Sequence, residues 1–361
     1  MKTRKAENLT KISLATLIAF AALAAPAAAA PKDTLTFAAV GDIMMGLNYP
    51  DNAPVLPPQD GALTFESVAG VLRDADVTIG NLEGVLLDSG GYAKRCANPS
   101  VCYVFRSPER YVKHLVNAGF DLMSVANNHS GDFGDAGRAG TVRSLRGADL
   151  GFAGFEGIAE SYILEREGIR YGFVAFAPNT GTVSFHDQPR ARELIAEVKK
   201  KCDIMIVSMH IGAEGSRHSR ITRNSELFVG ENRGNPYAFA RLAVDSGADL
   251  VIGHGPHVPR AVDLYKGKFI AYSLGNFATN TSVNISGESG YAPILKIRTD
   301  RKGDFIDGEI VSAIQQGERG ERRPHLDPSG ACVKEIKRLT EIDIPETGIA
   351  IDGKTGRITK K

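Results

Sequence analysis

The chain has 361 residues, 43 basic and 42 acidic side chains and an apolar fraction of 43%, which is ordinary for a globular protein. The net charge of +1 gives no broad basic surface, so the sequence argues against nucleic acid as a partner. The length fits either one large domain or two.

Residues 1–30 have the pattern of a secretory signal peptide. Basic residues near the start precede an apolar run over 12–24, and a row of alanines ending at Ala30 supplies small residues for signal peptidase. The run is too short for a stable membrane span, although an uncleaved anchor stays open. Cleavage removes four basic residues and one acidic residue, which takes the net charge from +1 to −2. We therefore expect an exported protein, located in the periplasm, at the cell envelope or outside the cell.

Four cysteines in an exported chain are compatible with disulfide bonds. Cys96 and Cys102 flank a turn-rich segment, and we predict a disulfide between them. Cys202 and Cys332 form either a second bridge or two separate thiols. A zinc site built from cysteines is disfavoured because the chain has no C-x-x-C pair.

Apolar strands and amphipathic helices alternate through the first half of the chain. The pattern predicts strands at 34–40, 77–79 and 120–126, with helices at 65–74 and 108–118. Ser107 is the expected N-cap of the second helix, and Pro108 its first residue.

The same alternation continues through the second half. Strands are predicted at 151–153, 203–209 and 249–252, helices at 191–200 and 237–246, and paired strands at 162–165 with 171–176, 262–265 with 269–272, and 292–298 with 305–314. We expect a main domain over 31–315 and a polar, mobile extension over 316–361, with one helix near 332–339. This order predicts α/β layering with one mixed sheet or two.

Polar residues stand at the ends of five apolar strands, where open α/β sheets bind ligands. They are Asp42, Glu83, Asn128 with His129, His210, and the pair His254 and His257. Each has an ordinary structural explanation by itself, such as a turn aspartate, a solvated acid or a histidine of the core. Five such endings together favour a functional site.

Mixed oxygen and nitrogen ligands suit Mn²⁺, Fe ions or Zn²⁺ better than an all-oxygen Ca²⁺ site. A carboxylate can bridge two such ions, which then activate water and stabilise the entering and leaving oxygens. His129 is a candidate for protonating a leaving group, because Asn128 beside it already offers a ligand oxygen.

Further residues are candidates for supporting roles. Asn81 and Asn276 also lie near strand ends, and Glu214 follows His210 by four residues and is expected to orient its ring. The basic stretch from Arg217 to Arg233 is by default a solvated loop, and the alternative is a clamp for an anionic substrate. No Gly-x-Ser-x-Gly elbow, Walker loop or dinucleotide-binding motif is present, and the glycine-rich piece at 131–140 lacks a strand–loop–helix context.

Six pieces of sequence resemble, in order, those of a known family. They are Gly41-Asp42-Ile43-Met44, Asn81-Leu82-Glu83-Gly84, Ala126-Asn127-Asn128-His129, His210-Ile211-Gly212-Ala213-Glu214, Gly253-His254-Gly255-Pro256-His257-Val258 and Ser273-Leu274-Gly275-Asn276-Phe277. The family is that of the CapA-type poly-γ-glutamate capsule synthesis proteins, within the calcineurin-like metallophosphoesterase superfamily. The resemblance implies a four-layer α/β/β/α fold with two mixed β-sheets and a dinuclear metal site.

Carried over position by position, the resemblance assigns roles to the strand-end residues. The expected ligands are Asp42, Glu83, Asn128, His210 and His254, with His257 as a further candidate and His129 as the catalytic imidazole. The chain departs from the superfamily pattern at Met44, where a histidine is usual, and at His257, which comes three residues after His254.

Three functions are compatible with these departures. The first is synthesis, export or processing of poly-γ-glutamate or a related anionic polymer, alongside membrane capsule-synthesis proteins. The second is a secreted metallophosphoesterase that acts on a phosphoester. The third is a non-catalytic module that binds polymer.

Overall fold

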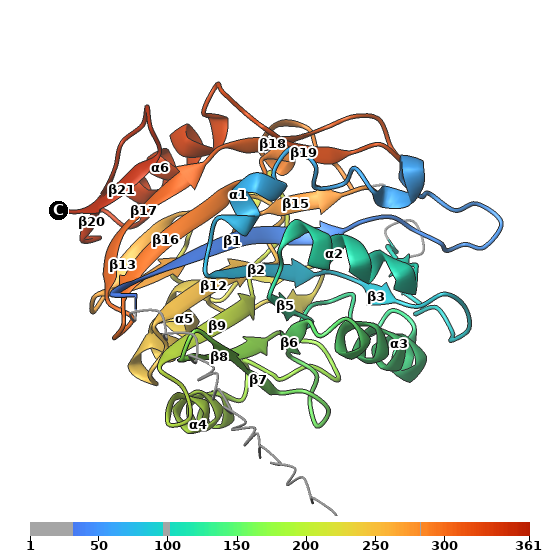
Figure 1. Cartoon of the computed structure of the whole chain (residues 1–361), viewed down its shortest axis with the longest axis horizontal. Coiled ribbons are helices and arrows are strands. Elements are labelled where there is room, and N and C mark those ends of the chain that lie inside the picture. Colours follow the sequence, from blue (N-terminus) through green and yellow to red (C-terminus); the bar gives the residue numbers. More distant parts are fainter. Residues whose placement is uncertain (1–31, 97–101, 282) are drawn as a thin grey trace, which may run out of the picture. The chain divides into compact units, whose positions relative to one another are not determined.

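The computed structural model describes residues 32–96, 102–281 and 283–361, and it places two mixed β-sheets face to face with helices outside them (Figure 1). The predicted signal peptide lies outside these residues. Within the described ranges, no helix combines the length and apolar character needed to cross a bilayer.

The first sheet has nine strands, in the order β20-β21-β17-β16-β1-β2-β5-β6 with β15 also paired to β1. Its strands are β1 (Thr34–Met44), β2 (Val77–Leu82), β5 (Leu122–Ser124), β6 (Gly151–Ala153), β15 (Asn276–Thr279), β16 (Ile294–Asp300), β17 (Phe305–Val311), β20 (Ile349–Ile351) and β21 (Arg357–Lys360). β1 runs parallel to β2 and antiparallel to β16, so the sheet is mixed.

The second sheet has six strands in the order β13-β14-β12-β9-β8-β7. They are β7 (Ser161–Arg166), β8 (Ile169–Phe176), β9 (Ile204–His210), β12 (Leu250–His254), β13 (Val262–Tyr265) and β14 (Lys268–Ala271). β8, β9, β12 and β14 are parallel, whereas β7 and β13 pair antiparallel at the two edges.

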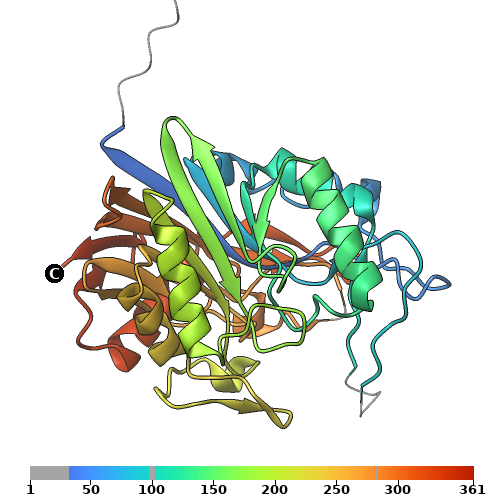
Figure 2. The same ribbon diagram turned by 90° about the horizontal axis from the view of Figure 1, so that it is seen from below.

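The α-helices and the short paired strands complete the regular structure, apart from a few 3₁₀ turns. They are α1 (Ala69–Arg73), α2 (Val112–Ala118), α3 (Gly134–Gly147), α4 (Gln188–Lys199), α5 (Pro236–Asp245), α6 (Ala331–Asp343), β3 (Val85–Leu86), β4 (Arg106–Ser107), β10 (Leu227–Phe228), β11 (Glu231–Asn232), β18 (Ala313–Gln316) and β19 (Arg323–Leu326). α3 and α4 lie on opposite outer sides of the paired sheets (Figure 2). The expected four-layer α/β/β/α architecture is therefore confirmed.

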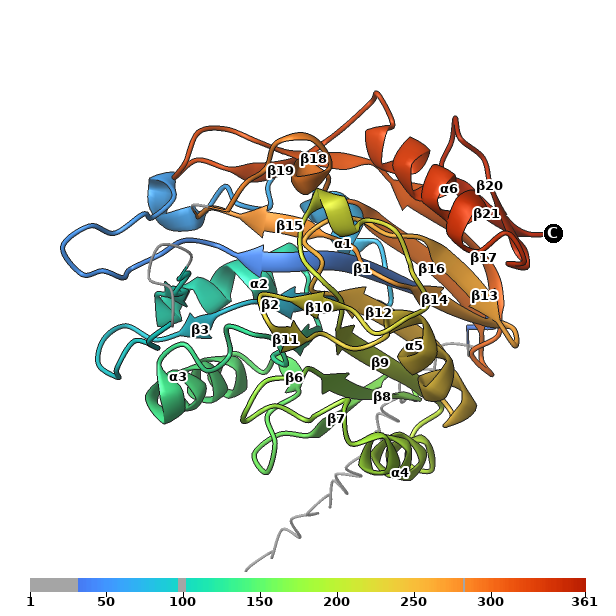
Figure 3. The ribbon, with the colours of Figure 1, turned by 180° about the vertical axis from the view of Figure 1, so that it is seen from behind.

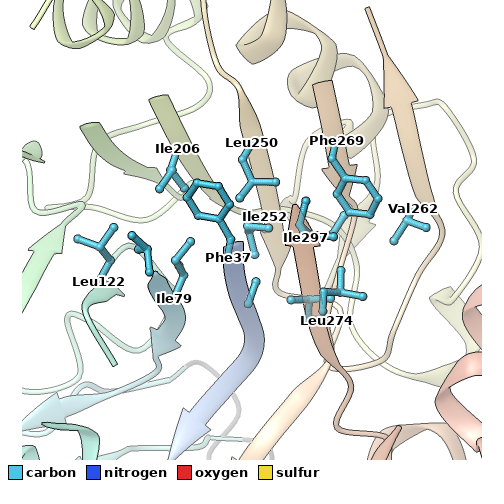
Figure 4. Close-up of a cluster of buried hydrophobic side chains, with 14 of the residues drawn as sticks. Phe37, Ile79, Leu122, Ile206, Leu250, Ile252, Val262, Phe269, Leu274 and Ile297 are labelled. Carbon is cyan, nitrogen blue, oxygen red and sulfur yellow. The ribbon is translucent and has the colours of Figure 1, made fainter. Parts of the chain in front are cut away.

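Alternating side chains of the strands build separate cores on the two faces of each sheet. In β9, Ile204 and Ile206 point between the sheets, whereas Met205 and Val207 pack toward α4 and α5. Figure 4 shows the inter-sheet core, where Phe37 of β1 lies among side chains of both sheets. This period of two explains why continuous apolar runs in the sequence become strands buried on both faces.

The C-terminal residues are part of the fold, and the prediction of a mobile extension after Gln316 is wrong. α6 covers the predicted helix and buries Cys332 and Ile336 in the inter-sheet core. β21 pairs with β17 and β20 pairs with β21, which extends the first sheet. The prediction failed because exposed polar residues lie between the apolar residues that this segment buries.

Two predicted helices begin later than the sequence indicates. The helix expected at 65–74 is regular only over α1, and the one expected at 108–118 starts with a 3₁₀ turn over Glu109–Tyr111 before α2. Ser107 does not cap it: the N-cap position is Pro108, no side-chain cap hydrogen bond is made, and the Ser107 hydroxyl donates to the carbonyl of Gly46.

The Cys96–Cys102 disulfide is confirmed, while Cys202 and Cys332 are separate buried thiols.

The sequence did not predict α3, because glycines interrupt its apolar pattern. The expectation that residues 131–140 lack a strand–loop–helix context is wrong, since α3 follows β5 after a loop. These glycines allow a close approach between helix and strand. A Cβ atom on Gly140 would lie 2.4 Å from the carbonyl oxygen of Leu86. A Cβ atom on Gly147 would meet nothing within 4 Å.

We predict opposite effects for alanine at these two glycines. Gly140→Ala should lower the free energy of unfolding by about 1–3 kcal/mol, because the added methyl group overpacks the contact with β3. Gly147→Ala should be neutral or stabilise by up to about 1 kcal/mol through its higher helix propensity. Urea denaturation of both variants measures the difference, and equal midpoints would contradict the close packing of α3.

Candidate metal centre

The strand-end residues expected to share a site are brought together. Asp42 stands near the end of β1, in register with Asn81 of β2 and Asn276 of β15. His210 and His254 are register partners at the ends of β9 and β12. The site therefore takes side chains from both sheets, with Glu83 following β2, Asn128 and His129 following β5, and His257 following β12.

Carboxylates and imidazoles meet within a few ångströms. Asp42 Oδ1 lies 3.3 Å from His254 Nδ1, and Asp42 Oδ2 lies 3.1 Å from His257 Nδ1. Glu83 Oε1 lies 3.5 Å from His257 Nε2. Asp42, Glu83 and His257 each offer one ligand atom, and these atoms all lie within 4.8 Å of one another. One cation could contact all three side chains.

Several buried ligand atoms at this point lack a hydrogen-bond partner. Within the described ranges of the chain, this holds for both oxygens of Glu83, Oδ1 of Asn128 and both ring nitrogens of His210 and His254. Nδ1 of His254 is included because its 3.3 Å contact with Asp42 Oδ1 does not have hydrogen-bond geometry. Leaving one buried polar group unpaired costs about 1–3 kcal/mol, and such groups are rare in native proteins. Their convergence from two sheets fits a divalent metal site.

The electrostatics of the buried groups point the same way. Burial raises the pKa of Asp42, but contacts with His254 and His257 outweigh it and hold that pKa below its usual range. Burial raises the pKa of Glu83 well above normal. Burial lowers the pKa of His210 far below normal, so its ring is neutral and offers a lone pair. Burial opposes protonation of His257, yet Glu83 and Asp42 raise its pKa to about 10. The paired carboxylates thus attract positive charge.

Asn81 and Asn276 hold these side chains in place. Asn81 Nδ2 donates to Asp42 Oδ1 at 2.8 Å, and Asn127 Nδ2 in turn donates to Asn81 Oδ1 at 3.2 Å. Asn276 Oδ1 lies 3.0 Å from His257 Nδ1, and its Nδ2 donates to the His257 carbonyl. Both asparagines orient candidate ligands without being candidates themselves.

His129 is oriented by an aspartate that the sequence did not identify as its partner. His129 Nδ1 lies 2.8 Å from Oδ2 of the buried Asp132. Its other ring nitrogen, Nε2, lies 3.9 Å from Glu83 Oε1 and so faces the cluster. With Nδ1 donating to Asp132, Nε2 is the atom that can exchange a proton with a bound molecule. Burial lowers the pKa of His129 despite Asp132.

Glu214 has a different role from the one expected. Its carboxylate contacts Arg233 Nη1 at 3.0 Å, Asn128 Nδ2 at 3.3 Å and His257 Nε2 at 3.8 Å. It therefore holds the amide of Asn128 and leaves Oδ1 of that residue to the site. The prediction that Glu214 orients His210 finds no support in these contacts.

The basic stretch after Glu214 divides into different environments. Arg217 is exposed, whereas Arg233 is buried between Glu214 and Glu231 and is therefore not a free clamp. Arg220 and Arg223 pair with Asp343 and Glu346 at the end of α6. The loop that carries β10 and β11 lies in the foreground of Figure 3.

A buried ion pair that no sequence motif predicted supports this loop. Arg260 is fully buried and donates to both carboxylate oxygens of Glu226, at 2.9 and 2.8 Å. Glu226 Oε2 also accepts from the amide of Ala213, the residue before Glu214. The pair therefore fixes the backbone next to the site.

Met44 is the position at which the resemblance described above leads us to expect a histidine. Its side chain is buried in an apolar cluster with Leu47 and Phe105. This position therefore offers apolar packing in place of an imidazole ligand.

Fold and site together define a four-layer α/β/β/α protein with a candidate metal centre between the ends of its two sheets. The family model of the bacterial capsule synthesis protein PGA_cap matches residues 36–281, so the chain belongs to this family. The family expected from the motifs is confirmed.

Named relatives carry capsule-related descriptions. The capsule biosynthesis protein CapA of Bacillus anthracis is 28% identical over 81% of this chain and 71% of its own length. The PGA biosynthesis protein CapA of Bacillus subtilis is 29% identical over 74% of this chain and 70% of its own length. Among solved structures, the calcineurin-like phosphoesterase YfkN from Bacillus subtilis aligns with a TM-score of 0.45 and 13% identity, over 81% of this chain and 88% of that one.

Proposed function

We propose that this protein binds divalent transition-metal ions at the strand-end site and acts in synthesis, export or processing of poly-γ-glutamate or a related anionic polymer. The convergence of buried, unpartnered ligand atoms from both sheets carries the metal part of the proposal. The family membership and the names of the CapA relatives support the polymer part.

The donor set fits Mn²⁺, Fe ions or Zn²⁺, because it mixes carboxylate, amide and imidazole groups. The side chains that would hold metal, at two sites in this proposal, are Asp42, Glu83, Asn128, His210 and His254, with His257 as a further candidate. A bound ion would supply Lewis-acid polarisation and lower the pKa of a coordinated water.

The chain's own residues would then orient a substrate and move a proton. Asp132 fixes the ring of His129 so that Nε2 faces the cluster and can protonate a leaving group. Glu214 and Asn81 keep Asn128 and Asp42 in position. These contacts favour hydrolysis as the reaction type.

Binding of the polymer itself tests the proposal. Titration of metal-loaded protein with poly-γ-glutamate, followed by calorimetry, should give saturable heats, and chain-length analysis should detect any cleavage. α-Linked polyglutamate is the matched control, because it carries the same charge on a different backbone. A flat titration with the γ-linked polymer would remove the polymer role.

A metal-dependent phosphoesterase is the second candidate. The observation that favours it is the His129–Asp132 pair beside the candidate metal centre, since phosphoester cleavage needs a proton for the departing oxygen. A non-catalytic polymer-binding module is the third, and it predicts polymer binding without turnover, unchanged when His129 is substituted.

Export is part of the same proposal, supported by the sequence of residues 1–30. Intact-mass measurement of the protein recovered from the periplasm or the medium should show a chain that begins after Ala30. Full-length protein retained inside the cell would contradict export.

A further inference from the structure

We propose that the Cys96–Cys102 disulfide positions His129 through the two chain arms that flank it, with Lys94 and Phe105 as the positioning residues. The inference rests on the proposed function only in taking His129 as the residue that moves a proton. It adds a part of the chain, outside the strand-end cluster, on which the orientation of that imidazole depends.

The arm before the disulfide is anchored on Asp132. Lys94 Nζ lies 2.6 Å from Asp132 Oδ1, and the Lys94 amide donates to the Asp132 carbonyl at 2.7 Å. The Asp132 side chain is fully buried, whereas Lys94 is 29% exposed. Lys94 therefore brings a positive charge from the surface to a buried carboxylate. Its Nζ lies 3.3 Å from Nδ1 of His129.

The arm after the disulfide is anchored on the same aspartate. The Phe105 amide donates to Asp132 Oδ2 at 2.6 Å, and this oxygen also contacts Nδ1 of His129. The Phe105 ring stacks on the His129 imidazole, with centroids 4.0 Å apart and planes 29° apart. Asp132 and Phe105 thus fix the imidazole by a hydrogen bond and by a face contact.

The disulfide joins these two arms close to their anchors. Cys96 follows Lys94 by two residues, and Cys102 precedes Phe105 by three. A cross-link at this place restricts how far the arms can separate when either anchor opens. Without it, each arm can leave Asp132 independently, and His129 loses its fixed orientation while the strand-end ligands stay in place.

The rate at which diethyl pyrocarbonate modifies His129 measures this positioning. Peptide mass spectrometry of the zinc-loaded protein gives that rate relative to the exposed His218 of the same molecule. In Cys96→Ser/Cys102→Ser, Phe105→Ala and Lys94→Ala, the relative rate should rise about tenfold, which corresponds to roughly 1.4 kcal/mol of lost anchoring. Cys202→Ala is the matched control, and Lys94→Arg and Phe105→Tyr should retain the wild-type rate.

The outcomes separate this inference from the proposed function. Unchanged zinc content with a raised rate at His129 supports the positioning role. A wild-type rate at His129 in the double serine variant overturns the role of the disulfide, whatever the zinc content. Wild-type protein without zinc would reject the metal proposal, while the modification rates would still test the arms. If the serine variant does not fold, Lys94→Ala and Phe105→Ala decide, and wild-type rates in both overturn the inference.

Discussion

Replacing Asp42 and His254 together with alanine will remove the metal that we expect in the purified protein. Wild-type protein supplemented with Mn²⁺ or Zn²⁺ should retain about one to two ions per chain, as a site with one or two metals requires. The double variant should bind metal more weakly by a factor above about 100, because even residues that only orient ligands contribute 10–100-fold. Elemental analysis after dialysis measures both.

The matched control for this substitution is Asp135→Ala/His218→Ala. It removes one carboxylate and one imidazole from exposed positions, so it should leave the metal content unchanged. Equal metal content in both double variants would show that binding takes place elsewhere. Wild-type protein that stays metal-free under supplementation with either ion would reject the site itself.

Replacing His129 with alanine will lower hydrolysis of a bis-aryl phosphate by about 10²–10⁴-fold if the site is a phosphoesterase. The physical reason is that Nε2 of His129 is held toward the cluster by Asp132, and alanine leaves no group there to protonate the departing oxygen. Metal content should stay at the wild-type value, because Asn128 supplies the neighbouring ligand oxygen.

Two controls accompany this measurement. His218→Ala should leave the rate unchanged, since this histidine is exposed on a loop. A chelator should abolish turnover in the wild-type protein. If wild-type turnover does not exceed the background of His129→Ala, the phosphoesterase function is rejected and only the polymer functions remain.

The sequence predicted the strands that carry the site because their residues follow simple rules. β9 and β12 are continuous apolar runs, and the polar residues that end them stand out against that background. His210 and His254 are adjacent because the structure pairs β9 and β12 as neighbouring parallel strands, whose ends meet. The rule accounts for neighbours within one sheet, whereas the meeting of residues from both sheets was expected only from the family resemblance.

The contacts that support the site could not be predicted from the sequence, because they join segments far apart in the chain. Glu214 reaches Asn128 across 86 positions, and Phe105 meets Asp132 across 27. Nothing in the spacing of these residues marks them as partners. The same holds for Arg260, whose buried pairing with Glu226 depends on how the loop after β9 returns to the sheet.

Anomalous diffraction from crystals grown with Mn²⁺ or Zn²⁺ locates the metal directly. Data collected above and below the absorption edge should give a peak enclosed by Asp42, Glu83, His210 and His254. A supplemented crystal with no peak at that point, or with its peak elsewhere on the protein, would contradict a metal centre at the strand ends.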